Sequence, residues 1–258
     1  MQTDLNNAID DVLGLKDLRP SVHVNKVMSR LVDSVLQMSE IDETLLGEQI
    51  NSSRIRNISA EAESELEKFW ARLITDSSHP HEVLASFPYL GNYGELTVRE
   101  LGLVAKSGLE TSNIRKVLVI GSGPLPLSAY ELHKQSGARV DHVDSSREAM
   151  ELCEKVGRSL AIESKYYEGY GEDVQLDDTY DLILIAALAG KSKNDKQAIL
   201  DNILPHLSDQ GRIIMRSAHG SRSLLYPVVE PNEMTGVTLL SEYHPTDYII
   251  NSVLVYGK

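Results

Sequence analysis

Cysteine is almost absent from this sequence, since Cys153 is the only one among 258 residues. A single cysteine excludes a disulfide within the chain and any cysteine-rich zinc site, and it fits a reducing, cytoplasmic setting. The first residues include neither a basic segment nor an apolar core, so we expect no signal peptide. No apolar run reaches the ~18 residues that would span a bilayer.

Basic residues are also scarce, with 25 Lys and Arg against 38 Asp and Glu and a net charge of -13. Such a charge repels phosphate backbones and anionic headgroups, so we expect neither a nucleic-acid nor a membrane partner. Aromatic residues other than Tyr are few, and Phe69, Trp70 and Phe87 all fall within one short stretch. That stretch is therefore a candidate packing or functional region.

Residues 1–112 show helical periodicity. Apolar residues recur at three- and four-residue spacing in 5–15, 22–38 and 62–74. Ser59 is expected to cap the third helix, which would end near Ile74. Its expected buried stripe consists of Ala62, Leu66, Phe69 and Leu73. These residues predict an all-α N-terminal domain.

The pattern changes near residue 113. Short apolar runs then alternate with helix-length segments, which predicts an α/β fold with a parallel sheet covered on both faces. The predicted strands are 116–120, 138–143, 181–187, 212–215, 237–243 and 252–256. The last two have no helix between them, which indicates an antiparallel edge. We therefore expect a Rossmann-like domain over 113–258.

A glycine turn follows the first predicted strand, where 116–120 runs into Gly121, Ser122, Gly123 and Pro124. Glycine between a strand and a helix lets the backbone approach a ligand closely. Pro124 removes an amide donor, and Pro126 occupies the third glycine position of a dinucleotide fingerprint. Since a pyrophosphate needs those amides, the turn favours a nucleoside ligand without phosphates. A tight turn with no ligand is the alternative.

One acidic residue follows the predicted strand 138–143, and two more lie where we expect a further strand to end, before the predicted strand 181–187. Asp144 lies 21 residues past Gly123, where an acid usually binds ribose hydroxyls. Its alternative role is capping the helix that begins near Ser146. Glu172 and Asp173 could accept the amine of adenine, or could belong to a solvated turn. Together these features predict an S-adenosylmethionine (SAM) pocket and hence a fold of the SAM-dependent methyltransferase type.

Two glutamates of the third helix form a candidate catalytic feature. Glu63 and Glu67 are four residues apart, so they share one helix face at the border of the apolar stripe. Partial burial there would raise a carboxyl pKa toward that of a general base. A solvated acidic face is the alternative. The segment from Phe87 to Glu100 is dense in Tyr and Asn, and either pins a domain junction or lines a pocket.

The sequence from about Ile58 to its end resembles the nicotianamine synthase family. The resemblance is carried by the segments AEAESELE, FPYLGNYGEL, VIGSGPLPLSAYEL, LILIAALAGK, RSAHGSRSLLYPVVEPNEMTGV and EYHPTDYIINSVLV. It implies transfer of the 3-amino-3-carboxypropyl group of SAM rather than its methyl group. Three SAM molecules would give one nicotianamine, with closure of an azetidine ring, and three methylthioadenosines. SAM is then the substrate, and no other cofactor is implied.

The resemblance also implies roles for individual residues. Glu67 would accept the proton of the attacking amine, and Tyr93 would orient that amine or relay its proton. The SAM contacts implied are Gly121, Ser122, Gly123, Pro124, Asp144, Glu172, Asp173 and Ala187. The substrate contacts implied are Asn92, Arg216, His219, Arg222 and Tyr226. Arg216 is the first choice for binding carboxylates, with a structural ion pair as its alternative.

Three other functions compete with this one. A methyltransferase would share the SAM pocket but would release S-adenosylhomocysteine. A related opine-metallophore synthase would add one aminocarboxypropyl group to histidine. A SAM-binding protein without activity would release nothing. The product of a nicotianamine synthase binds metals in metal homeostasis, but the eight His residues show no ligand spacing for a metal in the enzyme itself. The sequence also allows a homodimer.

Overall fold

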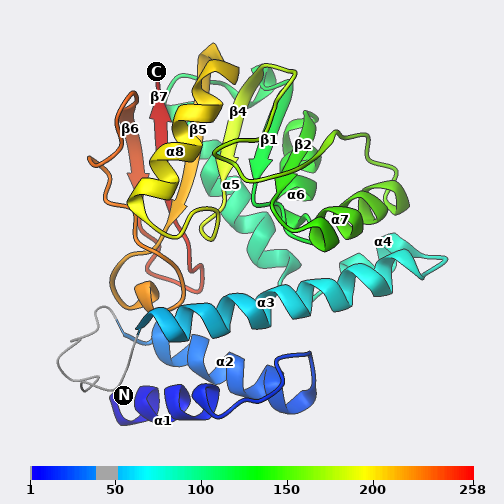
Figure 1. Ribbon diagram of the computed structural model, residues 1–258, viewed down its shortest axis with the longest axis vertical. Helices are drawn as coiled ribbons and strands as arrows, with labels where there is room; N and C mark the ends of the chain where they lie inside the picture. The colour runs from blue at the N-terminus through cyan, green and yellow to red at the C-terminus, as the bar shows by residue number, and fades with distance from the viewer. Residues whose placement is uncertain (1, 39–51) are drawn as a thin grey trace.

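The computed structural model describes residues 2–38 and 52–258 (Figure 1). Helices make up the first part of the chain, as the periodicity predicted. They are α1 (Gln2–Leu13), α2 (Val22–Leu36), α3 (Ser52–Thr75), α4 (Pro80–Ala85) and α5 (Leu90–Lys106). None of the helices that the structure describes is long and apolar enough to cross a bilayer.

The second part of the chain contributes a seven-stranded sheet in the order β3-β2-β1-β4-β5-β7-β6. Its strands are β1 (Lys116–Ile120), β2 (Arg139–Asp144), β3 (Tyr166–Glu168), β4 (Tyr180–Ile185), β5 (Leu207–Ser217), β6 (Thr238–Tyr243) and β7 (Ser252–Gly257). The first five strands pair in parallel, whereas β7 pairs antiparallel with both β5 and β6. This arrangement confirms the predicted parallel sheet with an antiparallel edge.

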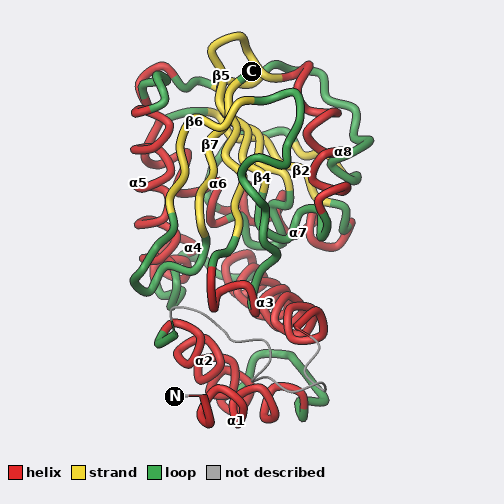
Figure 2. Tube along the Cα trace, turned by 90° about the vertical axis from the view of Figure 1, so that its left-hand side faces the viewer, coloured by secondary structure: helices red, strands yellow, loops and turns green. Residues whose placement is uncertain are grey.

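Helices cover both faces of the sheet. The remaining α-helices are α6 (Leu127–Ser136), α7 (Arg147–Ser159) and α8 (Lys193–Ile203). Figure 2 shows α5 and α8 on opposite sides of the strands. Val117 and Val119 of β1 pack with α5 and α6, whereas Leu118 and Ile120 pack with α8. Because both faces are covered, the strands are continuous apolar runs rather than alternating ones.

Helix α3 crosses the carboxyl ends of the parallel strands (Figure 1). Arg72 bonds Glu148 of α7 at 2.8 Å, so one end of α3 is tied to the α/β layers. At the other end, Arg56 donates to the Ser223 carbonyl oxygen at 2.7 Å. Helices α1 and α2 pack beyond α3 in a separate apolar cluster. The carboxyl edge of the sheet is therefore covered by α3.

Two local expectations for α3 are wrong. The helix begins at Ser52, so Ser59 lies inside it, with its hydroxyl buried and without a partner. Phe69 and Leu73 are 44% and 41% exposed rather than buried. Helix α3 packs against α1, α4 and α7 along its length, so its buried face changes direction. A single stripe with one cap does not describe a helix with several neighbours.

Candidate active site

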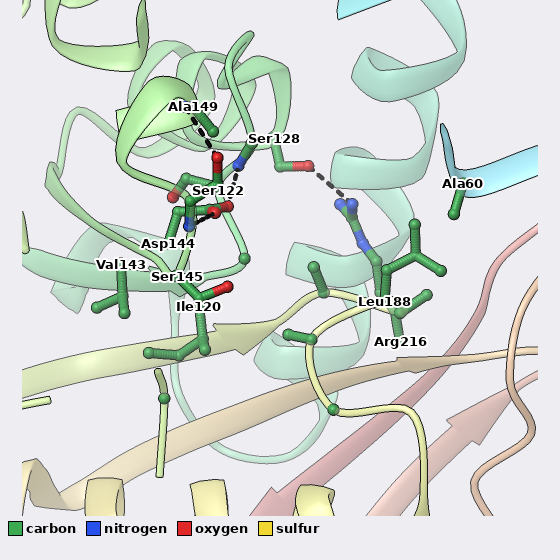
Figure 3. Close-up of a pocket in the computed structure, with 18 of the residues that line it drawn as sticks. Ala60, Ile120, Ser122, Ser128, Val143, Asp144, Ser145, Ala149, Leu188 and Arg216 are labelled. Carbon is green, nitrogen blue, oxygen red and sulfur yellow. Dashed lines mark hydrogen bonds between the residues drawn. The ribbon is translucent and has the colours of Figure 1, made fainter. Parts of the chain in front are cut away.

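A cavity of about 550 Å³ lies between α3 and the carboxyl ends of the parallel strands. Parallel α/β sheets place their ligand sites at this edge. Twelve of the residues singled out in the sequence line the cavity: Glu63, Glu67, Tyr93, Gly121, Ser122, Gly123, Pro124, Asp144, Glu172, Ala187, Arg216 and Tyr226. Figure 3 shows part of this lining, with Ser122 and Asp144 on one side and Arg216 on the other.

The glycine turn after β1 forms one wall of the cavity. The amides of Gly121 and Ser122 donate to the Val143 carbonyl oxygen at 2.8 and 3.1 Å. The Gly123 amide donates to Asp144 Oδ2 at 2.8 Å. The φ angles of Gly121 and Gly123 are +80° and +67°, which side-chain-bearing residues rarely adopt. Since all three amides already have acceptors, the turn offers none of them to a phosphate.

Asp144 accepts backbone hydrogen bonds from two segments, the glycine turn and the start of α7. Its Oδ1 accepts from the Ser146 amide at 2.9 Å, and Ser146 Oγ in turn caps α7. Its carboxylate also borders the cavity. A carboxylate has about four acceptor positions, so two backbone amides leave capacity for ligand hydroxyls. Asp144 therefore braces the glycine turn and can still bind a ribose.

The opposite wall is built by two glutamates of α3 and two tyrosines. Glu63 and Glu67 face Tyr93 of α5 and Tyr226, which follows the 3₁₀ helix η4 (Gly220–Leu224). Tyr226 Oη donates to Glu63 Oε2 at 2.9 Å. Glu67 reaches the glycine turn, because a Cβ added to Gly123 would lie 2.7 Å from Glu67 Oε2. A carboxylate therefore abuts the predicted SAM-binding loop.

Burial and like charge raise the pKa of the acidic groups on this wall. Burial raises the pKa of Glu67 well above its ordinary value, and the charges of Glu63 and Asp144 raise it further. The pKa of Glu63 is also raised by burial, although hydrogen bonding from Tyr226 opposes this. Burial and the neighbouring carboxylates raise the pKa of the Tyr93 hydroxyl, which therefore stays a donor. Glu67 thus has the raised pKa that proton transfer from an amine requires.

Arg216 is held in a buried ion pair. Its Nε and Nη2 donate to the two carboxylate oxygens of Glu100 at 2.7 and 3.1 Å. Its Nη1 donates to Ser128 Oγ at 2.7 Å (Figure 3). The structural ion pair is therefore present, and the guanidinium also lines the cavity. Glu100 was visible in the sequence at the end of the Tyr-rich segment, but nothing there identified Arg216 as its partner.

Four predicted contact residues do not line the cavity. Asn92 is partly exposed on α5, and Asp173 is exposed next to Glu172. His219 is exposed, and its ring stacks on His244 with centroids 4.2 Å apart. The structure brings neither the two polar residues nor His219 to the site.

Arg222, the fourth, is buried and already has backbone partners. Its Nε donates to the Ile249 carbonyl oxygen at 3.1 Å and its Nη2 to the Asp247 carbonyl oxygen at 2.6 Å. In this arrangement it holds the segment before β7 rather than facing the cavity.

Several cavity residues were not singled out in the sequence. They include Ser64, Ser128, Tyr170, Lys191 and Asn251. Lys191 Nζ donates to Asn57 Oδ1 of α3 at 3.4 Å. All of them except Tyr170 lie in segments that carry the family resemblance, but the sequence does not show which side chains of a segment reach the cavity. Within 2–38 and 52–258, no three His, Cys, Asp or Glu side chains gather as a metal site would require.

Comparison with known proteins settles the family. The sequence model described as nicotianamine synthase protein matches residues 3–258. The chain belongs to the nicotianamine synthase family. A tomato (Solanum lycopersicum) protein named nicotianamine synthase is 32% identical over 260 residues, covering 96% of this chain and 80% of that protein. Nicotianamine synthase 9 of barley (Hordeum vulgare) is 34% identical over 254 residues, covering 95% and 74%.

A solved structure shows the same fold. It is a mutant of MtNAS in complex with S-adenosylmethionine, with a TM-score of 0.81, 24% identity, and coverage of 100% of this chain and 97% of that one. The predicted methyltransferase-like Rossmann fold is therefore confirmed. Membership of the nicotianamine synthase family makes this chain a SAM-dependent aminocarboxypropyltransferase. The alternatives of a methyltransferase and of a SAM-binding protein without activity do not agree with this membership.

Proposed function

We propose that this nicotianamine synthase family member assembles nicotianamine in the cavity beneath α3, with Glu67 as the base. The contact between Glu67 and the glycine turn carries this proposal, because it places a carboxylate of raised pKa beside the predicted SAM-binding loop. The substrate is SAM, and no further cofactor is needed. The complex of the MtNAS mutant with S-adenosylmethionine supports SAM as the ligand of this fold.

In this proposal the strand-end wall binds the donor SAM. Asp144 accepts hydrogen bonds from the ribose hydroxyls, and Glu172 accepts one from the adenine amine. The backbone of Gly121–Pro124 and Ala187 borders the nucleoside without Cβ interference at the two glycines. All of these groups lie on the cavity surface. Since the amides of Gly121, Ser122 and Gly123 are already bonded, this wall needs no rearrangement to receive a nucleoside.

The α3 wall performs the proton chemistry. The sulfonium of the donor already activates its γ-carbon, so the protein must mainly align the nucleophile. That nucleophile is an α-amine, which is an ammonium near neutral pH and loses a proton to Glu67. Its lone pair then attacks the γ-carbon, the carbon–sulfur bond breaks, and the electron pair stays on sulfur in neutral methylthioadenosine. Tyr93, a protonated donor beside Glu67, orients the carboxylate.

Arg216 is the proposed contact for substrate carboxylates. Each intermediate carries carboxylates, and arginine binds these groups well. Arg216 lines the cavity, whereas the guanidinium of Arg222 binds backbone carbonyls and His219 lies outside. Ser128, which accepts from Arg216 Nη1, lines the cavity beside it. A carboxylate could replace the Ser128 hydroxyl as the acceptor of that donor.

Incubation of the purified protein with SAM alone tests the function. We expect nicotianamine and methylthioadenosine in a one-to-three ratio by mass analysis. Release of S-adenosylhomocysteine would contradict aminocarboxypropyl transfer. Product formation only after histidine is added would instead favour the opine-metallophore type of synthase.

We also propose a cytoplasmic location, supported by the single free and buried thiol of Cys153. Fractionation of cells that express the protein would test this, and recovery outside the cytoplasm would contradict it. A homodimer remains a prediction from the sequence, and sedimentation of the purified protein would test it.

A further inference from the structure

Glu63 and Tyr226 are two cavity residues that the chemistry above leaves without a task. Glu63 precedes Glu67 by one helical turn on α3, so both carboxylates lie on the same side of the helix. The Tyr226 hydroxyl donates to Glu63 Oε2 at 2.9 Å and fixes that side chain at the cavity wall. Tyr93 reaches the same wall from α5.

The charges around this pair are unbalanced. Five acidic residues line the cavity, and three of them, Glu63, Glu67 and Asp144, interact electrostatically with one another. Two basic residues, Lys191 and Arg216, line the same cavity, and the Nε and Nη2 of Arg216 are already bonded to Glu100. Neighbouring carboxylates in a desolvated site cannot all ionise freely, so a proton is favoured on one of them.

Tyr93 connects the two glutamates electrostatically. Hydrogen bonding to Tyr93 lowers the pKa of Glu63 and of Glu67, against the larger effect of burial. A hydroxyl that serves two carboxylates can accept a proton on one side while it donates its own on the other. The groups facing the pair are Tyr93 from α5, Tyr226 after η4, Arg216 from β5 and Asp144 from β2.

We propose that Glu63, positioned by Tyr226, is the second member of a proton relay in which Tyr93 carries the proton from Glu67 to Glu63. The relay rests on the proposed function. Each intermolecular transfer converts a primary ammonium and a sulfonium into a secondary ammonium, neutral methylthioadenosine and one proton. Closure of the azetidine ring converts a secondary ammonium and a sulfonium into a tertiary ammonium, neutral methylthioadenosine and one proton. Glu67 takes that proton from the amine. Tyr93 then accepts it and passes its own hydroxyl proton to Glu63, so Tyr93 is unchanged.

Repeated transfer explains why a relay is needed. Glu67 abuts Gly123, and after one transfer it holds a proton that would block the next. Passing the proton to Glu63 resets Glu67 while intermediates still occupy the cavity. Glu63, which also lines the cavity, then releases the proton into it. Glu63 is therefore a positioning residue that acts through Glu67 and Tyr93.

The variant Glu63→Gln tests the relay, because glutamine can still accept from Tyr226 but cannot take up the proton. Rapid-quench measurement of methylthioadenosine with SAM alone separates the three transfers. We expect the first release within about twofold of the unchanged protein and the later ones slowed by about tenfold or more, a modest share of general acid–base effects. The product of a single transfer should accumulate, and the acidic limb of the pH profile should shift. Glu63→Asp should partly restore the later transfers.

Glu65→Gln is the matched control. Glu65 lies on the same helix but pairs with Lys68 at 3.0 Å outside the cavity lining, so all three transfers should be normal. Equal slowing of all three transfers in Glu63→Gln, or no slowing, would overturn the relay. So would a loss of SAM affinity that accounts for the whole effect. If the unchanged protein makes nicotianamine from SAM, the proposed function stands even when the relay fails.

Discussion

The two walls of the cavity differ in how their polar groups are bonded and in the pKa of their acidic groups. On the strand-end wall, the polar groups of Gly121, Gly123 and Asp144 are already bonded to one another or to Val143. On the α3 wall, burial raises the pKa of both glutamates, Glu67 most strongly. The strand-end wall is held by hydrogen bonds within the protein, whereas the α3 wall contains carboxyl groups whose ionised form is disfavoured by burial.

This difference separates binding from chemistry. A wall with satisfied backbone groups keeps its shape and can receive a nucleoside at little reorganisation cost. Buried neighbouring carboxylates destabilise the empty protein, but they supply a base whose pKa suits an amine proton. Such sites trade stability for activity. Changes on the two walls should therefore fail in different ways.

The largest effect is expected for Glu67→Gln, which keeps the shape of the α3 wall but removes the base. Turnover should fall by about 10²–10⁴-fold, the usual range for a general base. SAM affinity should change little, because the glycine turn is intact. Methylthioadenosine release and calorimetric binding would measure the two, with Glu65→Gln as the control. Near-normal turnover would show that Glu67 is not the base, and that proton transfer is not a function of the α3 wall.

A loss of stability against unfolding is expected for Glu100→Gln, because this change leaves the charge of Arg216 buried without its counter-charge. Breaking a buried ion pair typically costs ~3–5 kcal/mol in the free energy of unfolding. Urea unfolding would measure it. Glu95→Gln is the control, because Glu95 pairs with Arg99 of the same helix at the surface and should cost at most ~1 kcal/mol. Equal losses in both variants would mean that the pair at Arg216 is not special.

Asp144→Asn should weaken the strand-end wall alone. The amide has one oxygen, so it cannot serve the amides of Gly123 and Ser146 and a ribose hydroxyl as the carboxylate does. Losing charged hydrogen bonds of ~1.5–3 kcal/mol predicts SAM affinity lower by about 10–100-fold. Turnover at saturating SAM should fall less. A variant that binds SAM normally but turns over slowly would contradict the division between the walls.

The smallest expected effect is a shift in pH dependence. The pKa of Glu67 is raised above the ordinary 4.5, and a base loses its activity when it is protonated. As pH is lowered, kcat/KM should therefore start to fall at a higher pH than it would with an ordinary glutamate as the base. Because the pKa of Glu67 is higher in the folded than in the unfolded protein, its contribution to the free energy of unfolding is favourable at low pH. That contribution is lost as pH rises through the pKa of the folded state. Glu67→Gln should therefore gain thermal stability over the unchanged protein at alkaline pH and lose that advantage at acidic pH. A pH-independent difference would exclude the raised pKa.

The fold could be predicted to a large extent from local patterns. The β-branched apolar runs of β1 and β4 identify strands buried on both faces, and Gly121 and Gly123 mark the turn that follows β1. Helix α3 could be predicted as a helix, but not its start at Ser52 or its buried face. The start and the buried face of α3 depend on the elements that pack against it, and the spacing of apolar residues along one helix does not identify those elements.

The site was predicted residue by residue, but not as an arrangement. Family resemblance pointed to Arg216, His219, Arg222 and Tyr226 as one group, because they lie close in sequence. The structure separates them: Arg216 and Tyr226 line the cavity, Arg222 binds backbone, and His219 is exposed. Residues that are close in sequence can therefore point in different directions, because Arg216 belongs to β5 and the other three residues follow the strand.

The sequence by itself determined the chemical groups and their local geometry. Four-residue spacing on a helix places Glu63 and Glu67 on one side, and a glycine turn admits positive φ angles. Only the tertiary structure decided that α3 lies over the strand ends and brings Glu67 against Gly123. The spacing of residues along a helix determines which face each side chain lies on. Contact between elements, and the desolvation that raises the pKa of Glu67, come from the burial of surfaces that are distant in sequence against one another.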